Sequence, residues 1–265
     1  MKWGDARFYF FDPIAFSSAI NWYGWIIAGL LVGLGARMVH GDELCHVMMG
    51  APSLHFNSMV AFAIMYFSAS LMGNMNMEYK WFIGGSSVSK DVEDIYRIVS
   101  LILLALFIVL TIVVFLRTGD LSCIFTACYG ALISFGMMCS GLARPSKMLA
   151  AFHFLGDNWS PGVLLTYLFV FLVNFLLFKC FVGREFGPSL PGWLSFRNFI
   201  GSGMFGLGWG ITGLGPGAGL INFFIMPWVV VFVVFMIIGV LISDWLDGKQ
   251  SNSIFGDGLT EPLIE

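Results

Sequence analysis

The chain has 265 residues, of which 58% are hydrophobic and only 11% are charged, and its formal net charge at pH 7 is -3. A soluble domain carries about 25% charged residues, so this composition excludes an ordinary soluble protein. It predicts an all-α integral membrane protein with several spanning helices, whose first partner is the lipid bilayer. No tract of Lys and Arg offers a phosphate-binding surface, so nucleic acid is not expected as a partner.

Seven apolar runs of suitable length follow one another along the chain, since about 20 apolar residues cross a bilayer as a helix. They are residues 18–38, 57–73, 96–116, 121–142, 161–181, 199–214 and 220–243. Two further apolar pieces, near 43–51 and 146–155, are too short to cross and are predicted to be re-entrant half-helices. Lys and Arg are divided almost evenly between the two sides, which leaves the orientation open.

These runs predict one membrane domain over residues 1–265. We expect a first half at about 18–74, a polar loop at 75–95, a second half at about 96–243 and a tail at 244–265. The N-terminus does not resemble a cleavable signal peptide. A bacterial inner membrane and a eukaryotic organellar membrane, such as the mitochondrial inner membrane, are both open as locations.

Glycine and proline concentrate in an apolar region, in "GLGWGITGLGPGAG" at residues 206–219, and related stretches occur at 29–42 and, more weakly, at 130–143. Aligning Gly33-Leu34-Gly35 with Gly206-Leu207-Gly208 places Asp42 on Gly215. Such copies predict an inverted repeat of helix-plus-break units, which transporters use to build a substrate site. Close helix packing is the simpler reading for the glycines. The structural glycines are Gly33, Gly35, Gly41, Gly206, Gly208 and Gly210.

Enzymatic and metal chemistry find no support in the sequence. The five cysteines, Cys45, Cys123, Cys128, Cys139 and Cys180, show neither a CxxC pair nor a Cys/His metal spacing. There is no Ser/His/Asp set, no phosphate loop and no carboxylate pair. We therefore expect no catalytic residue, no metal site and no cofactor.

Three blocks in order resemble the YeeE/YedE sulfur-transport family, whose members include bacterial thiosulfate transporters. They are residues 33–61, "GLGARMVHGDELCHVMMGAPSLHFNSMVA", residues 130–167, and the glycine-rich stretch at 206–219. The resemblance extends from about residue 20 to 243. It implies a membrane transporter for thiosulfate or a related small sulfur-containing anion.

The family's transport path uses cysteines at three positions that are Asp42, Met49 and Gly215 here. Cys45 lies three residues after Asp42, on a compatible helix face, and either replaces the missing thiol or is a small buried residue. The substrate path implied by the resemblance is lined by Asp42, Cys45, His46, Met49, Gly213, Gly215, Pro216 and Gly217. A transport-inactive relative, serving as a subunit of a larger membrane complex, is the alternative.

Three basic side chains stand close to these blocks and are candidates for attracting an anion. They are Arg37, Arg144 and Lys147. Interfacial anchoring, with the charged head at the membrane surface, is the alternative for each of them.

Overall fold

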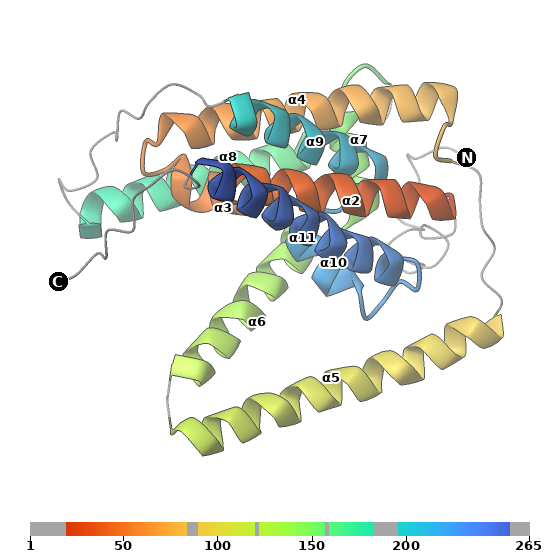
Figure 1. The fold of residues 1–265 in the computed structure, drawn as a ribbon, viewed down its shortest axis with the longest axis vertical. Coiled ribbons are helices and arrows are strands. Elements are labelled where there is room, and N and C mark those ends of the chain that lie inside the picture. Colours follow the sequence, from red (N-terminus) through yellow and green to blue (C-terminus); the bar gives the residue numbers. More distant parts are fainter. Residues whose placement is uncertain (1–19, 84–89, 120–121, 157–158, 183–195, 255–265) are drawn as a thin grey trace.

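The computed structural model describes residues 20–83, 90–119, 122–156, 159–182 and 196–254, and these residues form helices (Figure 1). The helices are α2 (Trp22–Val39), α3 (Glu43–Cys45), η2 (His46–Gly50), α4 (Phe56–Tyr79), α5 (Lys90–Thr118), α6 (Ser122–Ser140), α7 (Pro145–Phe152), α8 (Gly162–Leu177), η3 (Phe178–Val182), α9 (Phe196–Thr212), α10 (Pro216–Asn222) and α11 (Val229–Ile254). η2 and η3 are π-helical stretches that continue α3 and α8. The expected all-α architecture is therefore observed.

A long helix, a short helix and another long helix follow one another three times along the chain. The first unit is α2, α3 with η2, and α4; the second is α6, α7 and α8; the third is α9, α10 and α11. In each unit the residue with left-handed backbone comes directly after the first long helix, at His40 (φ 62°), Gly141 (φ 83°) and Gly213 (φ 70°). A left-handed residue is a common way to end a helix because it turns the chain out of the helical path.

The short helices also begin alike. Their N-cap residues, Asp42, Arg144 and Gly215, have extended backbone. Pro145 and Pro216 occupy the start of α7 and α10, where the missing proline N–H costs nothing. The sequence alignment that placed Asp42 on Gly215 thus pairs two N-caps, and it also pairs the two left-handed residues before them.

Four long helices pack in a row in the order α4, α9, α2 and α11, as the contacts between them show. Figure 1 shows this row from top to bottom. The direction of each helix follows from the glycine contacts. A Cβ added at Gly35 would lie 2.5 Å from the Phe205 nitrogen, and one at Gly208 would lie 2.7 Å from the Ala28 oxygen. Along these contacts the residue numbers rise in α2 while they fall in α9, so the two helices are antiparallel.

The order of the four helices is symmetric. If the first and third units exchange places, α2 stands where α9 was and α4 where α11 was, so the same order is read in the opposite direction. The contact of Gly35 with Phe205 becomes that of Gly208 with Val32 under the same alignment.

The core lies where α9 meets α4, α7 and α8. Trp209 and Phe152 are fully buried, with ring centroids 4.7 Å apart at 77°. Phe205 lies 5.9 Å from Trp209 on the other side. The edge-to-face contact of Phe152 with Trp209 joins α7 to α9.

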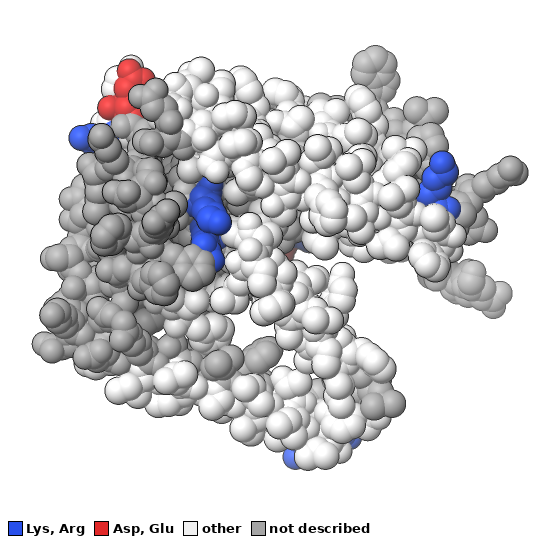
Figure 2. All heavy atoms as spheres, turned by 180° about the vertical axis from the view of Figure 1, so that it is seen from behind, with Lys and Arg blue, Asp and Glu red and all other residues white. Residues whose placement is uncertain are grey.

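Helix α5 lies apart from the four-helix row and contacts α6 (Figure 1). Its large apolar side chains are exposed, for example Leu101 at 67% and Leu116 at 73%. Among the described residues that Figure 2 shows on the rear face, most are uncharged, with a few Lys and Arg side chains and one Asp/Glu cluster at the upper edge. An exposed apolar surface of this extent indicates contact with lipid or with other membrane proteins.

The predicted count of seven spans stays a prediction. Four described segments are long and apolar enough to cross a membrane: Trp22–Gly50, Phe56–Asn76, Gly162–Phe181 and Val229–Asp247. A fifth results if Ile124–Ser140 and Pro145–Phe152, bent by 57° at the break between them, form one span. The chain is thus an integral membrane protein with four or five candidate spans among the described residues.

Three sequence boundaries were wrong. Helix α4 continues to Tyr79, five residues into the predicted polar loop. Its polar residue Asn76 is buried, at 3% exposed, and accepts from the Phe82 N–H at 2.9 Å. The loop also ends early, since α5 begins at Lys90. The run 220–243 is not one helix, because α10 ends at Asn222 and a turn through Pro227 precedes α11.

The α2–α9 contact predicts a position-specific loss of stability. A methyl group at Gly35 would meet α9 backbone at Phe205 and Gly201, whereas one at Gly203 would meet no atom within 4 Å. We expect Gly35→Ala to lower the free energy of unfolding by about 1–3 kcal/mol, as overpacking does, and Gly203→Ala to leave it unchanged or raised. Thermal unfolding of the purified protein in detergent measures both. Equal melting temperatures for Gly35→Ala and the parent would contradict this packing.

Candidate functional site

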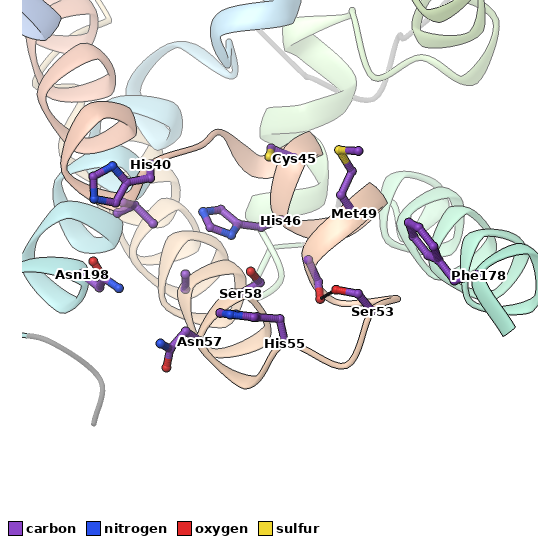
Figure 3. A pocket seen from close by; sticks show the side chains of 13 residues that line it. His40, Cys45, His46, Met49, Ser53, His55, Asn57, Ser58, Phe178 and Asn198 are labelled. Carbon is purple, nitrogen blue, oxygen red and sulfur yellow. Dashed lines mark hydrogen bonds between the residues drawn. The ribbon is translucent and has the colours of Figure 1, made fainter. Parts of the chain in front are cut away.

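A pocket of about 450 Å³ opens beside the short helix of the first unit. Figure 3 shows its lining side chains coming from the 39–61 segment and from two further helices. The lining residues are Val39, His40, Cys45, His46, Met49, Gly50, Ser53, His55, Asn57, Ser58, Ala61, Phe178 and Asn198. None of these described residues is acidic, and several carry neutral hydrogen-bond donors.

The short helical segment 43–50 presents Cys45 and Met49, both exposed, to this pocket. Its start is fixed by Asp42, whose carboxylate accepts the Cys45 backbone N–H at 2.8 Å. A side-chain oxygen at an N-cap commonly satisfies a free N–H of the first helical turn. The Asp42 carboxylate is therefore occupied in capping and does not line the pocket.

Three histidines approach the pocket, and two of them keep a buried nitrogen without a partner. His46 is 8% exposed, and neither its Nε2 nor the His55 Nδ1 has a hydrogen-bond partner. Figure 3 shows His46 lying among Cys45, Ser58 and His55. Among the described residues no three His, Cys, Asp or Glu side chains are grouped so as to hold a metal ion. Both imidazoles thus line the pocket while each keeps a buried, unpartnered nitrogen.

On its other side the segment 43–50 buries an acid. Glu43 is 2% exposed, and its Oε2 has no hydrogen-bond partner. The carboxyl lies on Gly215: a Cβ added there would lie 2.5 Å from the Glu43 Cδ and Oε2, and closer still to Oε1. The Glu43 carboxyl therefore occupies the space that any side chain at position 215 would need.

The surroundings of Glu43 are apolar or acidic. Helix α8 contributes Tyr167, whose buried hydroxyl has no hydrogen-bond partner and which interacts electrostatically with Glu43 and Asp42. The Tyr167 ring lies 6.4 Å from that of Trp209. No ion pair with Glu43 is formed by a cationic side chain in the part of the chain that the structure describes.

Each unit has a break, which is the non-helical link between its first long helix and its short helix: residues 40–42, 141–144 and 213–215. The break of the second unit packs against that of the third. A Cβ at Gly213 would lie 2.5 Å from the Pro145 carbonyl oxygen. Asn222 at the end of α10 donates to the carbonyl oxygens of Ala143 at 2.7 Å and of Ala218 at 2.8 Å. The third break therefore contacts both of the others, and the predicted proximity of 41–45 to 213–217 is observed.

The predicted path residues thus separate into two groups. Cys45, His46 and Met49 line the pocket. Gly213 and Gly215 lie at the contact between the breaks, and Gly217 lies 3.6 Å, measured from an added Cβ, from Leu44 and Met137. Pro216 begins α10.

The basic residues lie elsewhere. Arg37 is exposed and forms an ion pair with Asp244, which joins α2 to α11. Arg144 is the N-cap residue of α7. The Lys147 side chain covers Gly141, since its Cδ would lie 2.8 Å from an added Cβ. None of the three is among the described residues that line the pocket.

Glu43 and Tyr167 are the two residues that sequence reasoning missed. A glutamate next to Asp42, in a break between apolar runs, is typical of a hydrated turn. One signal was present: the N1 position is proline in the other two short helices and glutamate here. Tyr167 gave no comparable signal, since it stands inside a continuous apolar run.

Comparison with known proteins gives two relatives. The chain is 29% identical over 130 residues to a protein of Xylella fastidiosa (strain Temecula1 / ATCC 700964) named "Probable transporter", a match that covers 43% of this chain and 83% of that protein. A protein of the same name from strain 9a5c matches equally, over 84% of its length. No protein-family model matches the chain, and no solved structure does.

The capping role of Asp42 predicts how the segment 43–50 responds to substitution. Asp42→Ala removes the acceptor for the Cys45 N–H, and we expect it to lower the free energy of unfolding by about 0.5–2 kcal/mol. Asp42→Asn keeps a capping oxygen and should retain most of the parent's stability. Chemical unfolding of the two variants in detergent compares them. A loss in Asp42→Asn as large as that in Asp42→Ala would show that the charge, and not the cap, is what matters.

Proposed function

We propose that this protein transports a small sulfur-containing anion, of which thiosulfate is the first candidate, across the membrane in which it resides. The contact of the three helix breaks beside a pocket that holds no described acidic side chain is the observation that carries the proposal. Both relatives are named "Probable transporter", and these names support transport as the general activity.

The symmetry of the four-helix row supports the same proposal. In a bilayer, backbone outside regular helices is tolerated only where protein or a water-filled cavity covers it. Transporters built from inverted repeats place such breaks at the repeat interface and bind their substrate there. We take the first and third units, with their antiparallel α2 and α9 and their matching breaks, as an inverted repeat of this kind.

The chemistry of the pocket favours an anion over a cation. The thiol of Cys45, the hydroxyl of Ser58 and the amide of Asn57 are neutral donors, and all three residues line the pocket. The Asp42 carboxylate, which would repel an anion, is directed to the Cys45 N–H instead. Cys45 and Met49 together offer sulfur atoms to a soft solute, as the resemblance to sulfur transporters implies.

We assign the direct thiol contact to Cys45. Loss of one hydrogen bond to a charged group costs about 1.5–3 kcal/mol, or roughly ten- to hundredfold in a rate or an affinity. In proteoliposomes, Cys45→Ala should therefore slow the uptake of labelled thiosulfate by about that factor. Cys180→Ala is the matched control, because Cys180 is an exposed thiol on η3 that does not line the pocket. Uptake that is equally fast in the parent and in Cys45→Ala would remove Cys45 from the path.

A second function rests on a different observation. The α5–α6 hairpin exposes a long apolar surface away from the four-helix row, and the relay thiols of the resembling family are replaced at positions 42 and 215. A transport-inactive subunit of a larger membrane complex would have these features. Absence of uptake by the parent chain, together with a stable partner protein in gently solubilised native membranes, would favour this function over transport.

A further inference from the structure

The Glu43 carboxyl is buried in a way that helix capping does not explain. An acid in the first turn of a helix is ordinarily favourable because it faces the free N–H groups there. In α3 that task belongs to Asp42, which accepts the Cys45 N–H. Glu43 points instead onto Gly215, with Oε2 unpartnered and only 2% of the residue exposed.

The Glu43 carboxyl lies directly against the backbone of Gly215. Gly215 has no Cβ, and the Glu43 carboxyl fills the space that it leaves. The carboxyl of one break therefore closes against the backbone of the other, where the solute is expected to pass.

Charge decides which form of Glu43 is compatible with that position. An ionised carboxylate enclosed without a hydrogen bond or a cation costs several kcal/mol. The titratable groups that face it are Asp42 on its own segment and Tyr167 on α8, with Tyr66 of α4 beside Tyr167. None of the three carries a positive charge, and an anion approaching along the pocket would add negative charge. A proton on Glu43 removes the repulsion.

We propose that Glu43 is a proton-binding gate: its neutral carboxyl, seated on Gly215, closes the contact between the breaks, and its proton accompanies each anion. This inference rests on the proposed transport function and deepens it by naming the coupling ion. One carboxylate takes up one proton on the side of entry and releases it on the other side. One proton and one anion cross together, and no covalent bond to the solute forms.

The test uses the full-length protein in liposomes whose membrane potential is held at zero by potassium and an ionophore. Coupling of one proton to each anion predicts that labelled thiosulfate accumulates about tenfold for each unit of inward-directed pH difference, since a tenfold ratio and one pH unit are the same free energy. Glu43→Gln keeps the shape of the neutral side chain but cannot exchange a proton, so the contact should stay closed and thiosulfate should not accumulate above its external concentration at any pH difference. Gly215→Ala removes the seat and should likewise abolish accumulation.

Two matched variants serve as controls. Glu78→Gln neutralises an exposed acid at the end of α4. Gly203→Ala adds a methyl group to α9 where no atom lies within 4 Å. Both should accumulate thiosulfate as the parent does. If the parent takes up thiosulfate but the pH difference has no effect, or if Glu43→Gln keeps the full effect, the gate is overturned while transport stands.

If the parent takes up no thiosulfate, the transport proposal fails, and infrared spectroscopy of the protein in lipid decides about Glu43 separately. A C=O stretch of a protonated carboxylic acid at neutral pH, which shifts in heavy water and disappears in Glu43→Gln, supports a neutral, proton-exchanging carboxyl at this position. A spectrum of the parent without such a band overturns it. Folding of each variant is checked by size-exclusion chromatography and helical circular dichroism.

Discussion

The requirement to cover broken backbone inside an apolar layer determines most of this structure. Each of the three helix–short helix–helix units leaves backbone groups outside the regular helical ladder, and lipid offers these groups no hydrogen-bond partner. The units solve the problem jointly: Asn222 donates to the Ala143 carbonyl of another break, and the Gly213 region closes on Pro145. The four-helix row brings the breaks close enough for these contacts, and the glycines of α2 and α9 allow the row to form.

The same convergence creates a place where a polar side chain can be enclosed. Gly215 leaves a gap, and Glu43 fills it from the opposing break. A buried ionisable residue within a candidate span is costly and for that reason is commonly functional in membrane proteins. The pocket on the other side of the segment 43–50 provides neutral donors and sulfur atoms. One short helical segment thus connects this pocket with a buried acid, which is the arrangement that the proposed proton-coupled transport requires.

The sequence could predict the parts of the fold that depend on length and hydropathy. The runs 18–38, 161–181 and 199–214 coincide closely with α2, α8 with η3, and α9. Short helical segments also occur at 43–50 and 145–152, near the two predicted short pieces, while their re-entrant course stays a prediction. Helix α10 was missed because its end merges with the apolar run 220–243, and the single amide of Asn222 does not interrupt that run. Glu43 could not be placed because hydropathy assigns an acid to water, whereas the space beside Gly215 exists only once the two breaks meet.

Stability measurements on the Glu43 and Gly215 pair test the meeting of the breaks most directly. Unfolding free energies of Gly215→Ala, Glu43→Ala and the double variant form a double-mutant cycle. Residues in contact couple by about 0.5–3 kcal/mol. The structure predicts that Gly215→Ala destabilises the parent but is nearly neutral in the Glu43→Ala background, where the space for its methyl group is free. Equal costs of Gly215→Ala in the two backgrounds would show that the carboxyl does not lie there.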